Sequence, residues 1–514
     1  MHKDNNNSTP KYILAIDQGT TSTRAVLLDE SLSFVGEAQQ EFKQYFPKNG
    51  WVEHDADEIW KTVLDTCNTV LLSSKVDICS VSGIGISNQR ETIVAWDRRS
   101  GHPIYHAIVW QDRRTSQFCE TLKEQQLEAL IQQKTGLVID PYFSSSKIKW
   151  ILENVNEAKQ LLEQGALCVG TIDSYLIYKF SLGQVHVTDV TNASRTQLFN
   201  INDLCWDDEL LDLFKIPRSI LPEVKSCNSL FAMTHSEIFG HAIPICGVAG
   251  DQQAALIGQA CFEKGDIKNT FGTGCFSLLN IGDTPVISKN RLLTTVAFKI
   301  DDRVCYALEG SIFIAGAAIQ WLRDGLKLIE VSSEVERYAE QADPEQVLYL
   351  VPAFTGLGAP YWNAQARGAV FGLTRSSGIK EMCKATLESV AYQANDLLQT
   401  MKQDIVDEGL DIDLSVIKVD GGMTHNTWFL QFLSDMLGVK VKVAQCKEAT
   451  VLGAAYLAAN ALKIYPSPED FREQWQASDV YVDKKNNAWR RARQSGWESA
   501  VTSTLNFDDG QATK

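Results

Sequence analysis

The chain has 514 residues, room for two to four domains at about 150 residues each, and its 44% apolar and 22% charged content is ordinary for a globular protein. Its 48 basic residues against 64 acidic ones give a formal net charge of −16, which argues against nucleic acid and anionic membranes as partners. We interpret the basic run 490–493 as a solvated helix face rather than a nucleic-acid patch.

The cysteines and the apolar runs indicate where in the cell the protein works. Twelve cysteines are scattered without a C-x-x-C pair, which excludes zinc ribbons and thioredoxin-type chemistry. Residues 1–10 are polar and form no secretory signal. The sequence contains no run of about 18 apolar residues, the length that a membrane-spanning helix needs. We therefore expect a cytoplasmic protein with a disordered tail over residues 1–10 and no membrane insertion.

The first ordered pattern is a hairpin. Apolar runs over 12–16 and 24–28 flank the polar turn Gly19-Thr20-Thr21-Ser22-Thr23, which predicts strand, tight turn and strand. Further along the chain, the periodicity predicts helices over 57–72, 115–132 and 146–162, and strands over 81–86, 167–170 and 243–249.

A second hairpin of the same kind begins at Asn269, with the turn Gly272-Thr273-Gly274. Strand and helix patterns alternate after each hairpin, with later helices expected near 315–328 and 379–401. The repetition predicts two α/β halves around a central cleft, with a boundary near 257–266. The last 50 or so residues look like an appended helix and loop.

The chemistry-bearing motifs point to phosphate. The chain has no G-x-x-x-x-G-K-[ST] motif, so it is no P-loop enzyme. At the end of the first strand, Asp17 precedes a glycine and a row of hydroxyls, which can approach an anion while the carboxylate holds Mg²⁺ through water. An ordinary polar turn is the alternative, but a second Gly-Thr turn favours a two-sided phosphate clamp. A third glycine turn, 420–426, could lie against adenine or ribose.

Taken in order, these motifs resemble the FGGY carbohydrate kinase family, within the actin/hexokinase/heat-shock-70 ATPase superfamily. Residues 142–151 are similar to the first family signature, and residues 368–388 to the second. The resemblance extends from about residue 12 to about residue 462. Further stretches are similar to the glycerol branch of the family, namely 50–55, 88–92, 140–143, 250–253 and 271–276.

The resemblance implies an α/β fold with two actin-like (ribonuclease H-like) ATPase domains flanking a central catalytic cleft. The N-terminal domain, 11–258, would hold the glycerol site and the first phosphate loop. The C-terminal domain, 259–462, would hold the second phosphate loop and the adenosine site, and 463–514 would be a helix and loop extension. It further implies ATP and Mg²⁺ as cofactors, glycerol as substrate, and a homodimer or homotetramer.

Site residues follow from the same resemblance. The nucleotide would be bound by Thr20, Thr21, Ser22, Arg24, Thr273, Gly316, Gln320, Gly422 and Asn426, with Asp17 near the metal. The glycerol hydroxyls would be held by Arg90, Glu91, Tyr142, Asp251 and Gln252, with Trp110 and Phe276 on the carbon edge. Asp251 would also be the general base of a direct, in-line phosphoryl transfer.

Other interpretations remain open at this point. Arg90–Glu91 could be a surface ion pair, Asp251 the N-cap of a helix that begins at Gln252, and Trp110 and Phe276 plain core. The chain could act on another polyol or a pentulose, or use ATP only as an actin-like switch or binding module.

Two regulatory features of some bacterial relatives have no match in this sequence. Residues 234–243 lack the lysine and arginine of a fructose 1,6-bisphosphate loop, and 478–487 do not match the segment that docks a phosphotransferase regulator. We therefore expect the chain to escape inhibition by the sugar bisphosphate.

Overall fold

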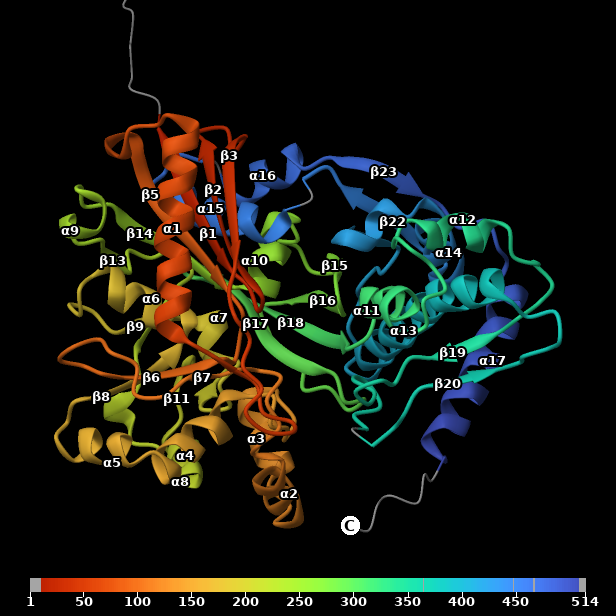
Figure 1. Ribbon diagram of the computed structural model, residues 1–514, viewed down its shortest axis with the longest axis horizontal. Helices are drawn as coiled ribbons and strands as arrows, with labels where there is room; N and C mark the ends of the chain where they lie inside the picture. Colours follow the sequence, from red (N-terminus) through yellow and green to blue (C-terminus); the bar gives the residue numbers. More distant parts are fainter. Residues whose placement is uncertain (1–10, 364, 447, 466, 508–514) are drawn as a thin grey trace, which may run out of the picture.

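The computed structural model describes residues 11–507 except 364, 447 and 466, so the tail expected over residues 1–10 lies outside the described residues. Two lobes stand side by side, each built around its own sheet (Figure 1). We call the part around the N-terminal sheet the first lobe and the part around the other large sheet the second lobe.

The first lobe is centred on a six-stranded sheet. Its strands are, in spatial order, β13 (Ala232–Met233), β14 (Pro244–Gly250), β5 (Val81–Asn88), β1 (Tyr12–Gln18), β2 (Ser22–Asp29) and β3 (Phe34–Glu41). Strands β1, β5 and β14 are parallel, while β1, β2 and β3 form antiparallel hairpins. The hairpin predicted at the start of the chain is thus confirmed. The parallel strands bring their carboxyl ends, at Asp17, Asn88 and Gly250, to one edge of the sheet.

Helix α1 (Ala56–Ser74) covers this sheet and shows how local sequence sets its limits. The Asp55 side chain accepts hydrogen bonds from the N–H groups of Asp57 and Glu58, an N-cap that starts the helix. Ile59, Val63, Cys67 and Val70 then form the fully buried stripe that faces β2 and β3. The helix ends where Lys75 takes the left-handed conformation.

A long insertion between β5 and β14 makes up the lower part of the first lobe (Figure 1). Three of its strands, β7 (Ala107–Ile108), β6 (Ile93–Asp97) and β8 (Leu167–Thr171), form a four-stranded sheet together with β4 (Glu53–His54), which precedes β5 in the chain. Its two-stranded pairs are β10 (Phe199–Asn200) with β11 (Cys205–Trp206), and β9 (Val187–Asp189) with β12 (Glu223–Lys225). Its helices, with α9 just before β14, are α2 (Ser116–Glu124), α3 (Glu128–Thr135), α4 (Ser144–Asn154), α5 (Asn156–Glu163), α6 (Ile172–Phe180), α7 (Val190–Ala193), α8 (Asp208–Phe214) and α9 (Ser236–Phe239).

Two helices predicted as continuous are in fact broken. The prediction for 115–132 covers α2 and α3, which part where Gln126 adopts a positive φ of 60°. The prediction for 146–162 covers α4 and α5, which part at Val155, an extended residue that caps both. Val155 stands between two asparagines, and asparagine and β-branched residues are both weak helix formers.

The second lobe repeats the core order of the first. Its sheet runs β17 (Leu293–Ile300), β18 (Arg303–Ile312), β16 (Cys275–Gly282), β15 (Ile267–Phe271), β21 (Val416–Asp420), β22 (Lys440–Ala444) and β23 (Ala477–Tyr481). Strands β18, β16 and β15 are antiparallel neighbours, and β15, β21 and β22 are parallel. This is the arrangement of β3, β2, β1, β5 and β14, so the predicted duplication is confirmed.

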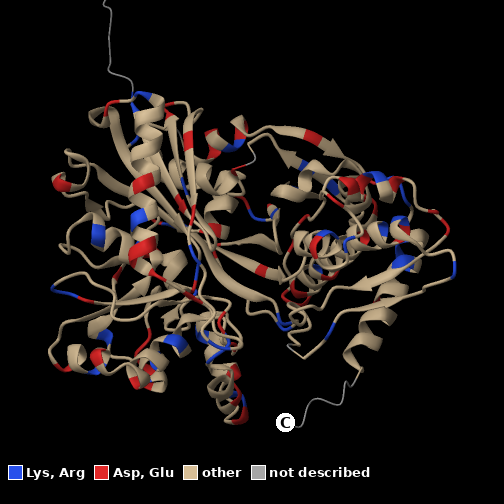
Figure 2. Ribbon diagram, in the orientation of Figure 1, with Lys and Arg blue, Asp and Glu red and all other residues tan. Residues whose placement is uncertain are grey.

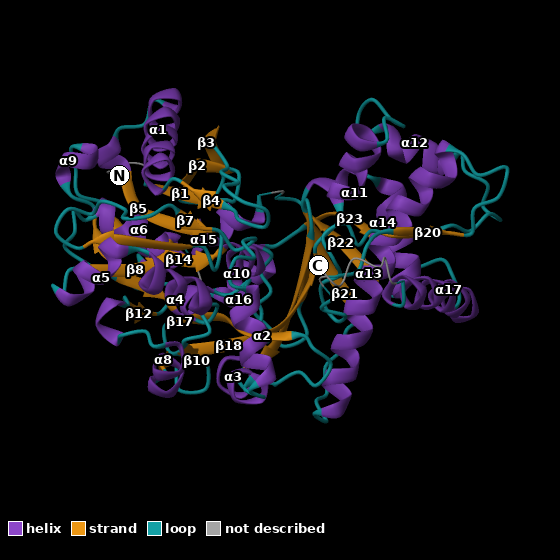
Figure 3. Ribbon diagram, turned by 60° about the horizontal axis from the view of Figure 1, so that its bottom comes forward, coloured by secondary structure: helices purple, strands orange, loops and turns teal. Residues whose placement is uncertain are grey.

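Helices and a small strand pair complete the second lobe. They are α11 (Gly316–Gln320), a π-helical turn (Trp321–Gly325), α12 (Glu334–Glu340), the pair β19 (Tyr349–Val351) and β20 (Ala369–Phe371), α13 (Ile379–Asp407) and α14 (Thr427–Leu437). In Figures 1 and 3 the β17–β18 hairpin extends from this lobe toward the first. Tyr306 of β18 donates its hydroxyl to the Ile201 carbonyl of the first lobe across 2.7 Å.

Two crossing helices lie where the lobes meet, α10 (Asp251–Gly258) and α15 (Ala449–Ala461). They cross at Gly258 and Gly453, where a Cβ atom would overlap the opposite backbone. Although α15 comes late in the chain, it packs on β1, β5 and β14 of the first lobe.

The C-terminal segment differs from the expected helix and loop. Besides α16 (Pro468–Gln474) and α17 (Asn487–Leu505) it supplies β23, which adds an antiparallel edge strand beside β22. The polar sequence of this exposed edge hides the strand. The interpretation of 490–493 as a solvated face is also wrong in part, since Arg490 bonds to the Asp435 carbonyl and Arg493 lies 3.7 Å from buried Glu388.

Charge and cysteines complete the description. Acidic and basic residues are interspersed along both lobes (Figure 2). All twelve cysteines are free. Within the described part of the chain, no helix combines the length and the apolar character that crossing a membrane requires.

Candidate active site

Two glycine turns, one from each main sheet, carry the predicted phosphate loops. In the first, the Gly19 N–H donates to the Ser22 carbonyl at 2.9 Å, and in the second the Gly272 N–H donates to the Gly274 carbonyl at 2.9 Å. The second turn is tied to the start of α11, where the Gly316 N–H donates to the Gly272 carbonyl at 3.0 Å. A Cβ on Gly316 would stand 2.6 Å from that carbonyl, so only glycine allows this close approach.

A pocket of about 480 Å³ opens beside the second turn. Five predicted nucleotide residues line it, namely Thr273, Gly316, Gln320, Gly422 and Asn426. Gly421 adopts a φ of 92°, and a Cβ atom there would stand 2.5 Å from the Phe271 carbonyl oxygen, so the third glycine turn requires glycine. The Asn426 side chain caps α14 by accepting from the Phe429 N–H at 2.8 Å. The pocket is lined by the polar residues Gln320 and Asn426 and by the apolar residues Ile319 and Val335.

The first-turn residues lie in the first lobe, outside that pocket. Thr20 accepts a hydrogen bond from the indole N–H of Trp110 at 2.9 Å. Arg24 pairs with Glu448 and donates to the Gln39 side chain. Thr21 and Ser22 complete the turn, where the Thr21 carbonyl accepts from the Phe42 N–H and the Ser22 hydroxyl from the Gln39 amide.

Asp17 is the last residue but one of β1, just before the first turn. Its Oδ1 atom is shielded from solvent and has no hydrogen-bond partner among the described residues. Burial, followed by the charge of nearby Asp251, raises the pKa of Asp17 to about 7. An orphaned carboxylate oxygen next to a second carboxylate suits a divalent cation, and Mg²⁺ usually takes only one or two protein carboxylates besides phosphates and waters.

Asp251 is the first residue of α10, at the carboxyl end of β14. The N-cap of that helix is Gly250, so Asp251 is not the cap of a helix that begins at Gln252. Its Oδ1 accepts from the Gln252 N–H at 2.7 Å and lies 3.3 Å from Arg90 Nε. The side chain is 30% exposed, whereas Arg90 is buried. Burial is the largest influence on the Asp251 carboxyl and raises its pKa, against the pull of Arg90 and Lys268.

The predicted acceptor residues meet around Asp251. Arg90 and Glu91 are both buried, so the surface ion pair is excluded. The Gln252 side chain accepts from the buried ammonium of Lys268 at 2.5 Å. The Phe276 ring lies 5.9 Å from the Arg90 guanidinium carbon.

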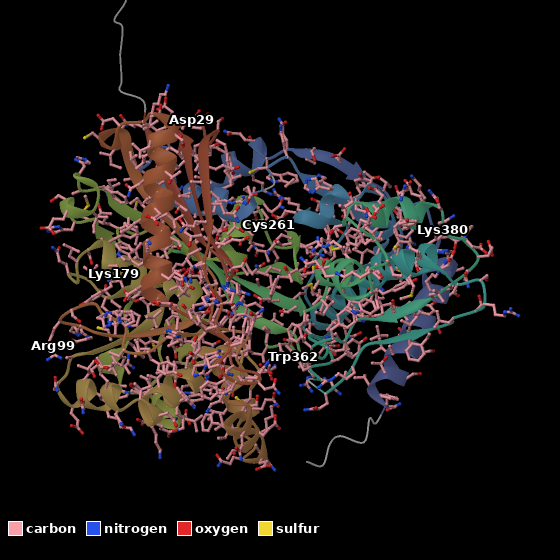
Figure 4. The ribbon with its side chains drawn as sticks, in the orientation of Figure 1. Asp29, Arg99, Lys179, Cys261, Trp362 and Lys380 are labelled. Carbon is pink, nitrogen blue, oxygen red and sulfur yellow. The ribbon has the colours of Figure 1, made fainter. Side chains whose placement is uncertain are left out.

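An aromatic cluster forms one wall. The rings of Trp110 and Tyr142 meet edge to face at 5.5 Å, and Trp362 of the second lobe packs on the same cluster. Figure 4 labels Trp362 at the lower edge between the lobes, with Cys261 farther up where they meet. Trp110 is partly exposed rather than sealed in the core.

Glu91 is held in an unusual conformation. Its φ is 61°, a region that residues with a side chain rarely adopt, and such positions cluster at functional sites. Arg195 Nε donates to its Oε1 at 2.6 Å, and the Ser144 hydroxyl donates to its carbonyl at 3.1 Å. These two hydrogen bonds fix the backbone conformation at Glu91, and with it the position of the adjacent Arg90.

Sequence reasoning missed three charged residues at this site, Arg195, Lys268 and Glu309. Glu309 accepts both terminal nitrogens of Arg90, at 2.7 and 2.9 Å. The available signal was a charge inside a buried strand, since β15 and β18 are otherwise buried around Lys268 and Glu309. Arg195 follows a short helix and carried no such signal.

Most of the chain matches two domain models of one protein family. The model described as the FGGY family of carbohydrate kinases, N-terminal domain, matches residues 12–258, and the C-terminal domain model of the same family matches 267–462. The chain belongs to the FGGY family of carbohydrate kinases. It is 53% identical over 494 residues to the glycerol kinase of Sinorhizobium fredii, with 96% of this chain and 99% of that protein covered. The glycerol kinase of Brucella ovis is 54% identical over the same shares.

Solved kinase structures confirm the expected fold. The glycerol kinase of Plasmodium falciparum with ADP matches with a TM-score of 0.90 and 39% identity, covering 97% of this chain and 99% of that one. Xylulose kinase from Lactobacillus acidophilus, at 23% identity and a TM-score of 0.84 over 96% of this chain and 99% of that one, shares the fold. The α/β architecture with two actin-like ATPase domains is thereby confirmed.

Proposed function

We propose that this FGGY kinase transfers the γ-phosphoryl group of ATP to a terminal hydroxyl of glycerol, giving sn-glycerol 3-phosphate, the entry step of glycerol catabolism. The observation that carries the proposal is Asp251, partly exposed, 3.3 Å from Arg90 and electrically coupled to Asp17, where the carboxyl ends of β5 and β14 meet. The high identity to full-length glycerol kinases supports the choice of substrate.

Asp251 acts as the general base. As the hydroxyl oxygen forms its bond to the γ-phosphorus, Asp251 accepts the hydroxyl proton, and the bond to the β,γ-bridging oxygen breaks to release ADP. The raised pKa of Asp251 favours this role, because a carboxylate of higher pKa accepts a proton more readily. No covalent phospho-enzyme is required.

The acceptor residues match a neutral triol, which needs both donors and acceptors. Arg90 donates, Glu91 and Asp251 accept, and Gln252 and Tyr142 can do either. Trp110 and Phe276 cover the carbon edge with apolar surface. Closure of the cleft would exclude water, which would otherwise compete as a phosphoryl acceptor.

The nucleotide lies between the two turns in this proposal. Gly316, Gln320, Gly422 and Asn426 hold its adenosine half. The backbone and hydroxyls of Thr20, Thr21 and Ser22 on one side, with Thr273 on the other, hold the phosphates, and Arg24 leaves Glu448 to join them. Asp17 holds Mg²⁺, which when bound neutralises charge on the phosphate oxygens.

Two other readings give different assay results. Another polyol or pentulose kinase would release ADP faster with xylulose than with glycerol, and an ATPase switch would release ADP equally without any acceptor. An ADP-release assay with glycerol, with xylulose and with no acceptor tests all three, and rapid release with glycerol alone is expected. Release that ignores glycerol would overturn the proposal.

We also infer the setting in which the enzyme works. Twelve free cysteines and the use of ATP support a reducing cytoplasm. Its resemblance to the family supports a homodimer or homotetramer, which light scattering on the purified protein would test.

A further inference from the structure

The buried carboxylate of Glu309, in the second lobe, binds the guanidinium group of Arg90 in the proposed acceptor site. Arg90 follows β5 in the first lobe, while Glu309 lies on β18 of the second. The two side chains form a bidentate pair, with Arg90 Nη1 to Glu309 Oε2 at 2.7 Å and Nη2 to Oε1 at 2.9 Å. Such a fork fixes the plane of the guanidinium group as well as its position.

The pair extends into a chain of four charges. Arg195 Nη2 donates to Glu309 Oε1 at 3.1 Å, and Arg195 Nε donates to Glu91 Oε1 at 2.6 Å. All four side chains are buried, with 2% exposure or less. Glu309 therefore touches Arg90 directly and reaches Glu91 through Arg195.

Stability alone does not explain this arrangement. Removing charges from water is costly, and apolar residues of the same volume often stabilise a fold as well as a buried ion pair does. What a charge network does supply is a fixed geometry, because each fork accepts only one orientation of its partner. Although burial opposes its ionisation, Arg195 and Arg90 lower the pKa of Glu309 to about 2, so Glu309 keeps its charge.

We propose that Glu309 is a positioning residue of the acceptor site: reaching from the second lobe, it orients Arg90 and, through Arg195, Glu91 for substrate binding. The inference rests on the proposed function, in which Arg90 and Glu91 bind glycerol. On this proposal, acceptor binding depends on how β18 of the second lobe is placed against the first lobe.

The nature of the side chain matters for this role. Glutamine has the same shape, but it offers one acceptor oxygen and turns an amide group with two hydrogens toward two arginines. The variant Glu309→Gln thus breaks one arm of the fork and leaves the two arginines facing a single carboxylate, Glu91, within the chain of four.

The test measures steady-state kinetics of purified Glu309→Gln with glycerol and ATP. We expect the KM for glycerol to rise about 10²-fold, the loss that a misplacement of roughly 1 Å can cause. The KM for ATP should stay within about threefold, because the adenosine pocket is lined by other residues. The control is Glu388→Gln, the same change at another buried carboxylate, which faces Arg493 and Lys384 and should leave both KM values unchanged.

A second variant covers a failure of Glu309→Gln to fold. Glu309→Asp keeps the charge but is one methylene shorter, so its KM for glycerol should exceed that of the unmodified enzyme and remain below that of any folded Gln variant. A folded Gln variant with the original KM for glycerol, a parallel loss of ATP affinity, or an Asp variant with unchanged KM would overturn the inference. Absence of glycerol phosphorylation in the unmodified enzyme would instead overturn the proposed function.

Discussion

Trp110 donates its indole N–H to the hydroxyl oxygen of Thr20 across 2.9 Å, and so joins the aromatic wall of the proposed acceptor site to the first glycine turn. The two residues lie 90 positions apart in the chain. The same indole ring meets Tyr142 edge to face. One side chain therefore contacts both the surface expected to cover the acceptor and the turn expected to hold phosphate.

Replacement of Trp110 tests its role on the carbon edge. Trp110→Ala should raise the KM for glycerol about 10- to 200-fold, the range for loss of a small apolar contact, and should relax discrimination against longer polyols. Trp110→Phe keeps most of the apolar surface and loses only the bond to Thr20, so it should change the KM for glycerol much less. An unchanged KM in folded Trp110→Ala would mean that the ring serves only packing.

Asp251→Asn tests the general base. Asparagine can still accept from the Gln252 N–H, and Gly250 remains the N-cap, so the melting temperature should change little. Loss of a positioned base should lower kcat about 10²- to 10⁴-fold, while ATP affinity stays within a few-fold. Glycerol binding should weaken as well, since the carboxylate also accepts a substrate hydrogen bond. A variant that keeps near-original kcat would exclude Asp251 as the base.

The pKa of Asp17 predicts a pH dependence of nucleotide binding. With a pKa of about 7, Asp17 loses its proton as the pH rises through neutrality, and only the carboxylate attracts the magnesium ion. Binding of Mg·ATP should therefore strengthen between about pH 6 and about pH 8. In Asp17→Asn the binding should be weaker and should lose this dependence, apart from the titration of ATP that both proteins share. Identical pH profiles would contradict the assignment.

The same shift predicts an effect on stability. Because the folded-state pKa is raised from 3.8 to about 7, the folded protein holds a proton that the unfolded chain has already released in that window. The contribution of Asp17 to stability thus falls as the pH rises from about 4 to about 7. Asp17→Asn removes this loss, and thermal unfolding without nucleotide should occur a few degrees higher at pH 8 than in the unmodified protein. A melting temperature of Asp17→Asn equal to or below that of the unmodified protein would mean that burial of the Asp17 carboxylate does not destabilise the fold.

Fructose 1,6-bisphosphate should leave the activity flat. The segment that would grip it passes through the exposed Gly240-His241 turn after α9 and has no lysine or arginine between 234 and 243. A bisphosphate needs charge-assisted donors, and neutral backbone at the surface does not replace them. The measurement is a titration of the sugar phosphate at fixed ATP and glycerol. Saturable inhibition accompanied by a change in subunit assembly would show that other residues form such a site.

The sequence was informative wherever a structural feature is local. Both hairpins were predicted because a glycine turn between two apolar runs encodes its own shape. The breaks at Gln126 and Val155 were missed because the 3.6-residue period continues across them and only the backbone conformation of one residue interrupts it. The strand β23 was missed because an edge strand with an exposed face needs no apolar alternation.

The site residues likewise divide into those that a sequence motif predicts and those that only the tertiary structure shows. Family motifs supplied residues that the fold brings to one pocket from three separate segments, such as Thr273, Gln320 and Asn426. The role of Glu309 was not predicted, because its partner Arg90 lies 219 positions away and no local pattern in β18 indicates that partner. A charge in a buried strand could have flagged Glu309, but only the tertiary structure could pair it.

The packing of α15 on the first lobe has a consequence for how the protein is made. Strands β1, β5 and β14 leave the ribosome long before the helix that covers them, which lies roughly 190 residues after α10. At about 5–20 residues per second, that interval lasts on the order of 10–40 s. We expect the sheet face that α15 covers to stay exposed during this interval. We therefore expect the N-terminal half to need chaperones during translation, since it cannot complete its core until α15 has been synthesised.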